Sequence, residues 1–292
     1  MNINIDNFRP LLLNIGYARH NSDWNWKNVC SPFTRLYYVT EGVAKIHYLD
    51  KDVELYPDHL YIVPANATHS NECKGTFCHY YIHIYEPIGS KSGIFDYYDF
   101  PLNGIPANSY ELQLFKDLTN LHPGGALLRS DPATYDNSLG FAEYLRKQEE
   151  LPDFLRMRVQ GSILILMSRF IKEAIPKKWT SDSRLIRAIH FIEQKIASSI
   201  GLKEVADAAC VSKQHVIRIF KYNLGQTPLQ FITNAKMRNA ELQLLTTDKP
   251  VNIIALELGY SDTSYFIRMF RRHTGKTPNS YRLYPTGISN IN

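Results

Sequence analysis

The chain lacks the features that would place it in a membrane or in the secretory pathway. In its 292 residues, no apolar run approaches the ~20 residues of a membrane-spanning helix. The N-terminal segment from Met1 to Leu13 carries Asp6 and Arg9 and has no signal-peptide core. We therefore expect a cytoplasmic protein with no membrane partner.

Cysteine is scarce as well. The four residues are Cys30, Cys73, Cys78 and Cys210, and no CxxC pair is present, which argues against a zinc knuckle. Cys73 and Cys78 could meet across a turn, but a cytoplasmic setting favours reduced thiols that pack inside the protein. We expect neither a metal nor another cofactor.

Acidic residues become rare in the C-terminal part of the chain. Residues 1–176 contain 16 basic residues (Lys and Arg) and 20 acidic residues (Asp and Glu). Residues 177–292 contain 17 basic and 8 acidic residues. The two net charges, −4 and +9, give the +5 of the whole chain. Basic charge confined to one region suggests a polyanionic partner for that region. A solvated basic surface would give the same count, so charge alone leaves both interpretations open.

Tyr, Ile and Val gather into short runs between about Arg35 and Tyr85. Gly, Pro, Asp and Asn separate these runs, as they do in turns. The expected strands are 36–39, 43–48, 52–55, 59–63 and 77–85. Short strands at this spacing predict a small barrel or sandwich.

After Pro106 the pattern becomes helical. We expect helices over 110–121, 132–150 and 153–174, and the third has apolar residues at helical spacing. Residues 163–167 of that helix are all apolar, so it should contact more than one surface. It could pack between two elements of one chain, or it could form a subunit interface.

The C-terminal region repeats itself at an offset of 50 residues. Arg218, Phe220, Lys221, Gly225, Thr227 and Pro228 recur as Arg268, Phe270, Arg271, Gly275, Thr277 and Pro278. In each copy a short helix, 202–209 or 251–258, precedes a turn and a second helix, 213–224 or 263–273. Small and apolar residues form the inner stripes, and glycine ends each second helix. This pattern predicts two helix-turn-helix units.

One long helix over 228–245 is expected to connect the two units. At ~1.5 Å per residue, this helix would span about 27 Å. A connector of that length could hold two recognition helices about one DNA turn apart, on one face of the duplex.

The second unit carries a specific motif. It consists of Ile253-Ile254-Ala255, Gly259-Tyr260-Ser261-Asp262, Ser264-Tyr265-Phe266, Arg268, Phe270-Arg271, Gly275, Thr277-Pro278 and Tyr281-Arg282. Over about 100 residues this region resembles the DNA-binding domain of the AraC/XylS family of transcription regulators. The first unit departs from the pattern at Ile217, where a polar residue often faces DNA. The resemblance implies an activator that binds double-stranded promoter DNA, contacts RNA polymerase and is not an enzyme.

The family pattern places the outward residues of each second helix in successive major grooves. On that basis the expected DNA-binding residues are Gln214, Arg218, Lys221, Thr263, Ser264, Arg268, Arg271 and Arg272. Arg218 and Arg268 suit guanine edges, and Gln214 suits adenine. Lys221, Arg271 and Arg272 are expected on phosphates, which add affinity without reading sequence. The alternative for Arg218 and Arg268 is a surface salt bridge.

The N-terminal β region resembles the cupin-like barrel of many AraC-family members. The matching residues are Tyr37 to Gly42, Tyr56-Pro57-Asp58, Val63-Pro64 and Thr68-His69. The spacing from Leu60 through Pro64 to His69 resembles the second cupin motif. The first motif, with its HxH pair and glutamate, is absent, which argues against a metal site and against catalysis.

An effector pocket is expected inside this barrel. Strand 77–85 places His79, Tyr81 and His83 on one face. If that face lines the barrel, the pocket is polar and aromatic; otherwise the histidines are exposed or hydrogen-bonded within the sheet. The candidate effector-binding residues are Tyr37, His69, Tyr81 and His83. The 19 tyrosines favour a sugar as the small-molecule effector, with aromatic or other metabolites as alternatives.

Together these patterns predict a multidomain protein with α and β parts. The expected domains are a cupin-like ligand-sensing and dimerisation domain at 1–175, a linker at 176–183, an AraC-type double helix-turn-helix domain at 184–284 and a tail at 285–292. A homodimer is expected, with Val159, Ile163, Leu166 and Phe170 at its interface. The main alternative is a ligand-independent DNA-binding protein whose barrel serves only in assembly. A cupin enzyme and a DNA-repair methyl acceptor are further alternatives, and the cysteine spacing does not suit the second.

Overall fold

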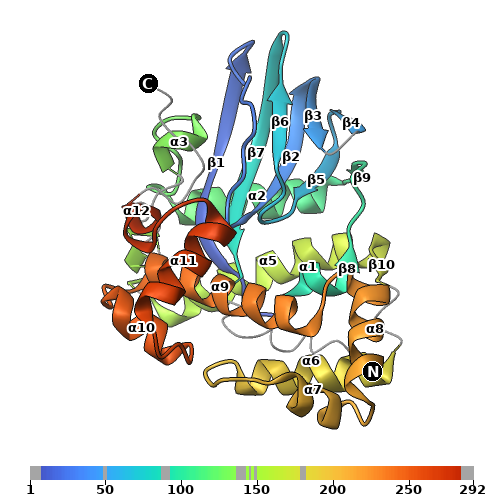
Figure 1. Cartoon of the computed structure of the whole chain (residues 1–292). Coiled ribbons are helices and arrows are strands. Elements are labelled where there is room, and N and C mark those ends of the chain that lie inside the picture. Colours follow the sequence, from blue (N-terminus) through green and yellow to red (C-terminus); the bar gives the residue numbers. More distant parts are fainter. Residues whose placement is uncertain are drawn as a thin grey trace. The chain divides into compact units, whose positions relative to one another are not determined.

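The computed structural model describes residues 8–48, 51–86, 93–135, 143–144, 146–147, 150–177 and 182–283 (Figure 1). They divide into two compact units. The sheet unit holds mainly Asn2–Pro87 and Asp99–Ile175, and the helical unit holds mainly Ile88–Tyr98 and Pro176–Pro285. The expected tail and half of the expected linker lie outside the described residues. In the described part of the chain, no helix is long and apolar enough to cross a membrane.

The sheet unit is built on two antiparallel sheets. The first has the order β1-β7-β2-β5-β9, with β1 (Leu11–Asn21), β7 (Thr76–Tyr85), β2 (Thr34–Gly42), β5 (His59–Val63) and β9 (Ile105–Pro106). The second has the order β4-β3-β6, with β4 (Lys51–Leu55), β3 (Ala44–Tyr48) and β6 (His69–Glu72). Side chains from both sheets share one buried core, which includes Trp24, Val39, Leu55 and Phe77.

The expected barrel needs correction, because the five-stranded and the three-stranded sheet are separate and the described strands do not close into a barrel. All five expected strands are present, but β1 and β6 were not predicted. The first half of β1 is buried almost continuously and therefore lacks the alternation that marks a strand. In β6 the buried positions are the polar residues His69 and Asn71, so no apolar pattern exists to detect.

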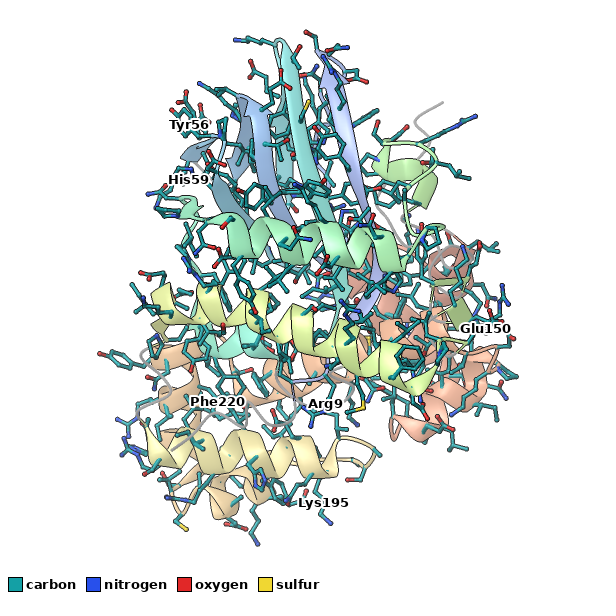
Figure 2. All side chains as sticks on the ribbon, turned by 180° about the vertical axis from the view of Figure 1, so that it is seen from behind. Arg9, Tyr56, His59, Glu150, Lys195 and Phe220 are labelled. Atoms are coloured by element: carbon teal, nitrogen blue, oxygen red, sulfur yellow. The ribbon has the colours of Figure 1, made fainter. Side chains whose placement is uncertain are left out.

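Two long helices of the sheet unit, α2 (Ser109–Leu121) and α5 (Asp153–Glu173), confirm two of the three helices expected there. Figure 2 shows them crossing the unit side by side. Arg169 of α5 donates to the buried carboxylate of Glu111 in α2 at 2.8 Å and to the carbonyl oxygen of Pro106 at 3.0 Å. Of the helix expected over 132–150, the structure describes α3 (Pro132–Tyr135), and much of the remainder lies outside the described residues.

The packing of α5 overturns the expected dimer interface. Val159, Ile163, Leu166 and Phe170 are at most 4% exposed within the single chain. Their spacing of three or four residues puts them on one helix face, and that face is the buried one. They are therefore core residues, whereas Phe154, Met157 and Ile165 of the same helix are exposed.

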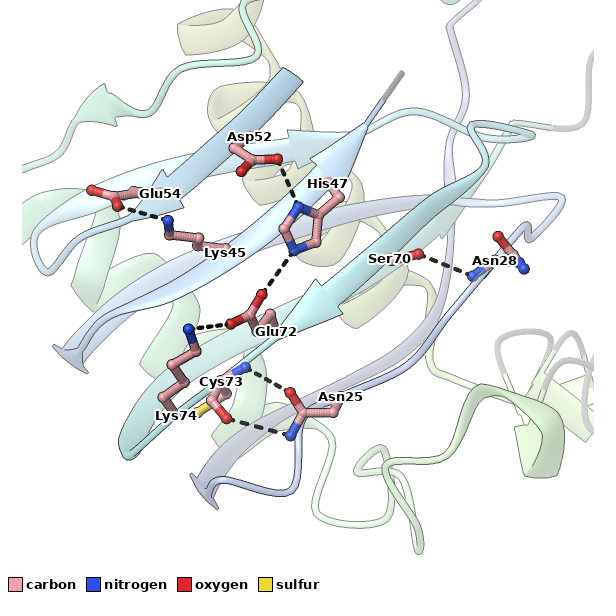
Figure 3. A network of polar contacts seen from close by, with 10 residues as sticks. All are labelled: Asn25, Asn28, Lys45, His47, Asp52, Glu54, Ser70, Glu72, Cys73 and Lys74. Atoms are coloured by element: carbon pink, nitrogen blue, oxygen red, sulfur yellow. Dashed lines mark hydrogen bonds and ion pairs between the residues drawn. The ribbon is translucent and has the colours of Figure 1, made fainter. Parts of the chain in front are cut away.

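Polar side chains cover one face of the three-stranded sheet (Figure 3). His47 of β3 bridges both neighbouring strands: its Nδ1 lies 2.7 Å from Asp52 Oδ1, and its Nε2 lies 3.1 Å from Glu72 Oε2. The hydrogen bond to Asp52, together with Glu72, raises the pKa of His47. Lys45 adds an ion pair to Glu54 at 3.3 Å. These contacts join the strands through cross-strand pairs on a partly solvated surface.

The helical unit contains two copies of a three-helix motif. The first consists of α6 (Ser183–Lys195), α7 (Leu202–Ala208) and α8 (Lys213–Leu224), and the second of α9 (Pro228–Thr246), α10 (Val251–Glu257) and α11 (Thr263–Thr274). Helix α12 (Pro278–Leu283) packs on α9 and α11, and the short helix α1 (Ile94–Tyr97) also belongs to this unit. Both predicted helix-turn-helix units are confirmed.

The structure refines the repeat, because the two turns differ by one residue. Cys210 and Gly259 hold the same left-handed turn position, with φ of 57° and 74°, and are 49 positions apart in the sequence. The N-cap residues Ser212 and Asp262 are 50 positions apart. The second turn therefore contains one extra residue before its recognition helix.

A buried cation joins the two copies. Lys236 of α9 is 5% exposed, and its Nζ donates to the carbonyl oxygens of Ser198 at 2.8 Å and Leu258 at 2.7 Å. Burial lowers the pKa of Lys236. Next to this contact, a Cβ on Gly259 would lie 2.8 Å from the carbonyl carbon of Ser198. The loop after α6, the connecting helix and the second turn therefore meet at one point.

The two left-handed turn residues give a matched pair of predictions about stability. We expect Gly259→Ala to lower the free energy of unfolding by about 2–3 kcal/mol, because strain at positive φ adds to the contact with Ser198. Cys210→Gly removes the strain of a Cβ at positive φ but increases the freedom of the unfolded chain, so we expect a change below ~1 kcal/mol. Urea unfolding of the full chain measures both. Similar effects of the two substitutions would contradict the close packing at Gly259.

Candidate nucleic-acid interface and ligand cavity

Helices α8 and α11 are built in the same way. The Ser212 hydroxyl accepts the backbone N–H of His215, and the Asp262 carboxylate accepts that of Ser264. Each helix ends at a glycine in the left-handed conformation, as predicted. The inner faces are buried through Val216, Ile219 and Phe220 in α8 and Phe266 and Phe270 in α11. Each helix therefore presents one outer face to solvent.

These outer faces carry the residues expected to bind DNA. Gln214, Arg218, Lys221, Ser264, Arg268, Arg271 and Arg272 are exposed, and Thr263 is half-buried. Within the described part of the chain, neither Arg218 nor Arg268 makes an ion pair, which removes the salt-bridge alternative. The guanidinium carbon of Arg268 lies 5.8 Å from the centroid of the Tyr265 ring.

A groove of about 890 Å³ borders Arg218. Its other lining residues come from α8 and from the start of α6: Asp182, Ser183, Arg184, Ile219, Tyr222 and Asn223. Sequence reasoning did not predict this neighbourhood, because α6 lies in the chain some 30 residues before α8 and carries no part of the repeated motif.

The sheet unit contains a cavity of about 220 Å³. Three of the four candidate effector residues line it, namely Tyr37, Tyr81 and His83, and His20 and His79 line it as well. His69 does not line the cavity; it is buried, and its Nδ1 donates to the carbonyl oxygen of Ala67 at 2.8 Å. Desolvation lowers the pKa of His69 to about 4. The histidine of the spacing that resembles the second cupin motif therefore lies outside this cavity.

Two cavity histidines are buried and incompletely hydrogen-bonded. His79 and His83 are each 2% exposed, and among the described residues the Nδ1 atom of each has no hydrogen-bond partner. Desolvation lowers the pKa of His79 to about 3, and desolvation together with the charge of Arg35 lowers that of His83 well below its usual value. Both rings are therefore neutral at pH 7. The alternative of exposed or sheet-bonded histidines is wrong.

The cavity offers neutral histidine and tyrosine groups to a ligand, and the charged residues Arg19 and Asp23 line it as well. The Tyr81 hydroxyl accepts the backbone N–H of Leu127 at 2.7 Å, and Asp23 holds His20 at 3.1 Å. Leaving a buried polar group unpaired costs about 1–3 kcal/mol, so a ligand that pairs with the histidine nitrogens would recover that energy. Among the described residues, no group of three or more His, Cys, Asp or Glu side chains could hold a metal.

All four cysteines are free thiols. Cys73 and Cys78 are buried in the sheet unit, as expected for packing cysteines, whereas Cys210 is exposed in the first turn.

The helical unit is similar to known proteins. Residues 205–283 match a family model described as a helix-turn-helix domain. Regulatory protein SoxS of Salmonella typhimurium is 33% identical over 94 residues, which are 32% of this chain and 88% of that protein. The arabinose operon regulatory protein of Escherichia coli is 29% identical over 102 residues, 35% of each chain. The chain spans about a third of the length of most of the curated relatives that it matches.

This chain is also similar to a solved structure, that of unsaturated-fatty-acid-bound ToxT from Vibrio cholerae. The alignment covers 97% of this chain and 98% of the ToxT chain. Its sequence identity is 11% and its TM-score is 0.47. SoxS is matched over most of its length, and the helix-turn-helix model coincides with the repeated unit that carries the AraC/XylS motif. The chain belongs to the AraC/XylS family of transcription regulators.

Proposed function

We propose that the chain binds specific promoter DNA through both recognition helices and regulates transcription, as an activator, in response to a small molecule. One observation carries the DNA-binding part: two helices of the same construction present exposed, unpaired arginines, Arg218 and Arg268, from one compact unit. Unpaired guanidinium groups on such helices can read guanine edges in the major groove.

The contact at Lys236 supports binding by both helices at once. It ties α9 to the loop before α7 and to the end of α10, so the two helix-turn-helix units cannot turn freely about the connecting helix. Two recognition helices with a fixed separation can enter successive major grooves on one face of the duplex. The family pattern adds RNA polymerase as the partner through which binding activates transcription.

Arg268 provides the test of sequence reading. We expect Arg268→Ala to lower affinity for the preferred site by ~1–3 kcal/mol and to relax one base position, because a bidentate contact to a guanine is lost. Arg271→Ala is the matched control, because Arg271 is expected to contact a phosphate. It should weaken binding to all DNA sequences about equally. Binding-site selection followed by titration measures both. An unchanged base preference in Arg268→Ala would reject its role.

The cavity supports an effector in the sheet unit. Its size suits a small molecule, and its neutral imidazole and phenol groups suit hydroxyl groups, which donate and accept hydrogen bonds without a charge. A sugar has such groups and faces on which Tyr37 and Tyr81 can stack. Some relatives are named for the arabinose, lactose and xylose operons, but each alignment covers only 26–42% of either protein. That the effector is a sugar is therefore part of this proposal.

A thermal-shift screen tests the effector. We expect a mono- or oligosaccharide to raise the melting temperature of the full chain saturably, and His83→Gln to abolish that shift because it changes a cavity nitrogen. His47→Gln, on the polar face of the small sheet, should keep the shift. Small aromatic metabolites form the comparison panel. A clear melt with no shift for any compound would favour the ligand-independent alternative, in which the sheet unit serves only in assembly.

The buried histidines also link the stability of the sheet unit to pH. The pKa of His79 is about 3 in the folded protein against a usual value of 6.5. Between these values the unfolded chain binds more protons, so the free energy of unfolding falls as the pH drops below 6.5. His47 has a raised pKa, so its contribution has the opposite sign: it is present below the usual pKa and is lost as the pH rises through the folded value.

We expect His79→Gln to flatten the loss of stability between pH 6.5 and pH 4.5, by up to about 1.4 kcal/mol per pH unit. His47→Gln should reduce stability on the acidic side without flattening that slope. Urea unfolding at a series of pH values separates the two. A slope that His79→Gln leaves unchanged would show that His79 is not held neutral by burial.

A homodimer remains part of the proposal, but its interface would be the exposed face of α5 and not the buried one. The exposed face of α5 carries Phe154, Met157 and Ile165, spaced so that they lie along one side of the helix. Apolar side chains gathered on one exposed helix face are typical of contact with another protein.

A further inference from the structure

The surface around α8 extends to a second helix. The first turn of α6 forms the other wall of the groove that borders Arg218. His215, Arg218 and Tyr222 follow one another at three- and four-residue spacing, so they lie along the side of α8 that faces this groove. Arg184 comes from α6, and among the described lining residues Asp182 is the one acidic side chain.

The guanidinium group of Arg184 is held from two sides. Its Nε and Nη2 donate to Asp182 Oδ1 and Oδ2 at 3.0 and 2.9 Å, and its Nη1 donates to Nε2 of His215 at 3.1 Å. The Asp182 carboxylate is fixed in turn, because it caps α6 by accepting the backbone N–H groups of Arg184 and Leu185. A guanidinium that is already oriented loses little conformational freedom when it binds.

This arrangement leaves donors available. A guanidinium has five N–H groups, and three of them donate to Asp182 and His215. The remaining two are the number that a bidentate contact with a phosphate uses. The Arg184 side chain is 46% exposed, so a phosphate can reach it.

We infer that Arg184 binds a backbone phosphate of the DNA beside the bases that α8 contacts, and that Asp182 and His215 are its positioning residues. The inference rests on the proposed function, because it requires α8 to dock on DNA. Arg184 and Arg218 line one groove from two helices, so both reach the same short segment of the duplex.

The second copy differs at the matching position. Helix α9 begins after the N-cap Thr227, and its second residue is Leu229, where α6 has Arg184. The phosphate contact therefore belongs to the first copy alone. That copy also carries Ile217 where a polar residue often faces DNA, so it combines weaker base reading with an additional backbone contact.

The test measures how binding depends on salt. The full chain and three variants, Arg184→Gln, Arg184→Lys and Lys195→Gln, are titrated with a selected DNA site between 50 and 200 mM salt. Lys195 is the matched control, since it is an exposed cation at the other end of α6 (Figure 2). Loss of one phosphate contact reduces the slope of log K against log salt by ~0.9.

We expect Arg184→Gln to show that reduction, with an affinity deficit about threefold larger at 50 mM than at 200 mM salt. Its base preference should stay that of the wild type. Arg184→Lys should restore the slope, because it keeps the charge, and Lys195→Gln should leave it unchanged.

Three outcomes would overturn the inference. Equal slopes for Arg184→Gln and Lys195→Gln, with Arg268→Ala still relaxing a base position, would reject the phosphate contact and leave the proposed function standing. A lower melting temperature in Arg184→Gln with an unchanged slope would make Arg184 only a bridge between α6 and α8. A wild-type chain with no sequence preference would reject the proposed function and this inference together.

Discussion

The buried ammonium group of Lys236 is the constraint on which the helical unit depends. A charge removed from water needs compensating partners, and here two carbonyl oxygens, those of Ser198 and Leu258, accept its hydrogen bonds. Leu258 is the C-cap of α10, where the helix dipole makes carbonyl oxygens most attractive to a cation. Because one oxygen precedes α7 and the other ends α10, the cation can be satisfied only when both copies are correctly placed. The separation of α8 and α11 follows from that requirement.

The repeat could be predicted because its residues obey local rules. Caps such as Ser212, terminal glycines such as Gly275 and inner faces at helical spacing act within one helix, and the structure has all of them. The two unpredicted strands depend on contacts between residues far apart in the sequence. The polar strand β6 is held by pairing with β3, and β1 pairs along its length with β7, so neither needs an apolar alternation of its own.

Local sequence rules also failed at the expected dimer interface and in the expected ligand pocket, for the same reason. Helical spacing located the buried stripe of α5, but spacing cannot say whether a stripe is covered by the same chain or by a second copy. A histidine in a motif-like position cannot show which way its ring points, and His69 turned out to bond the backbone at Ala67. The contact of Arg184 with His215 joins two helices with no shared motif, so only the fold reveals it.

The two copies of the motif share a scaffold but differ in the chemistry of their outer surfaces. The helix pairs, caps and terminal glycines match, whereas the extra turn residue, the ring of Tyr265 beside Arg268 and the groove beside Arg218 do not. A repeat whose cores are alike keeps both recognition helices at a fixed separation. Its outer residues then vary at little cost in stability, since exposed side chains contribute little to folding. In the proposed binding mode both copies contact bases and the first copy adds a backbone contact, and these roles can vary separately because affinity and sequence preference arise from different contacts.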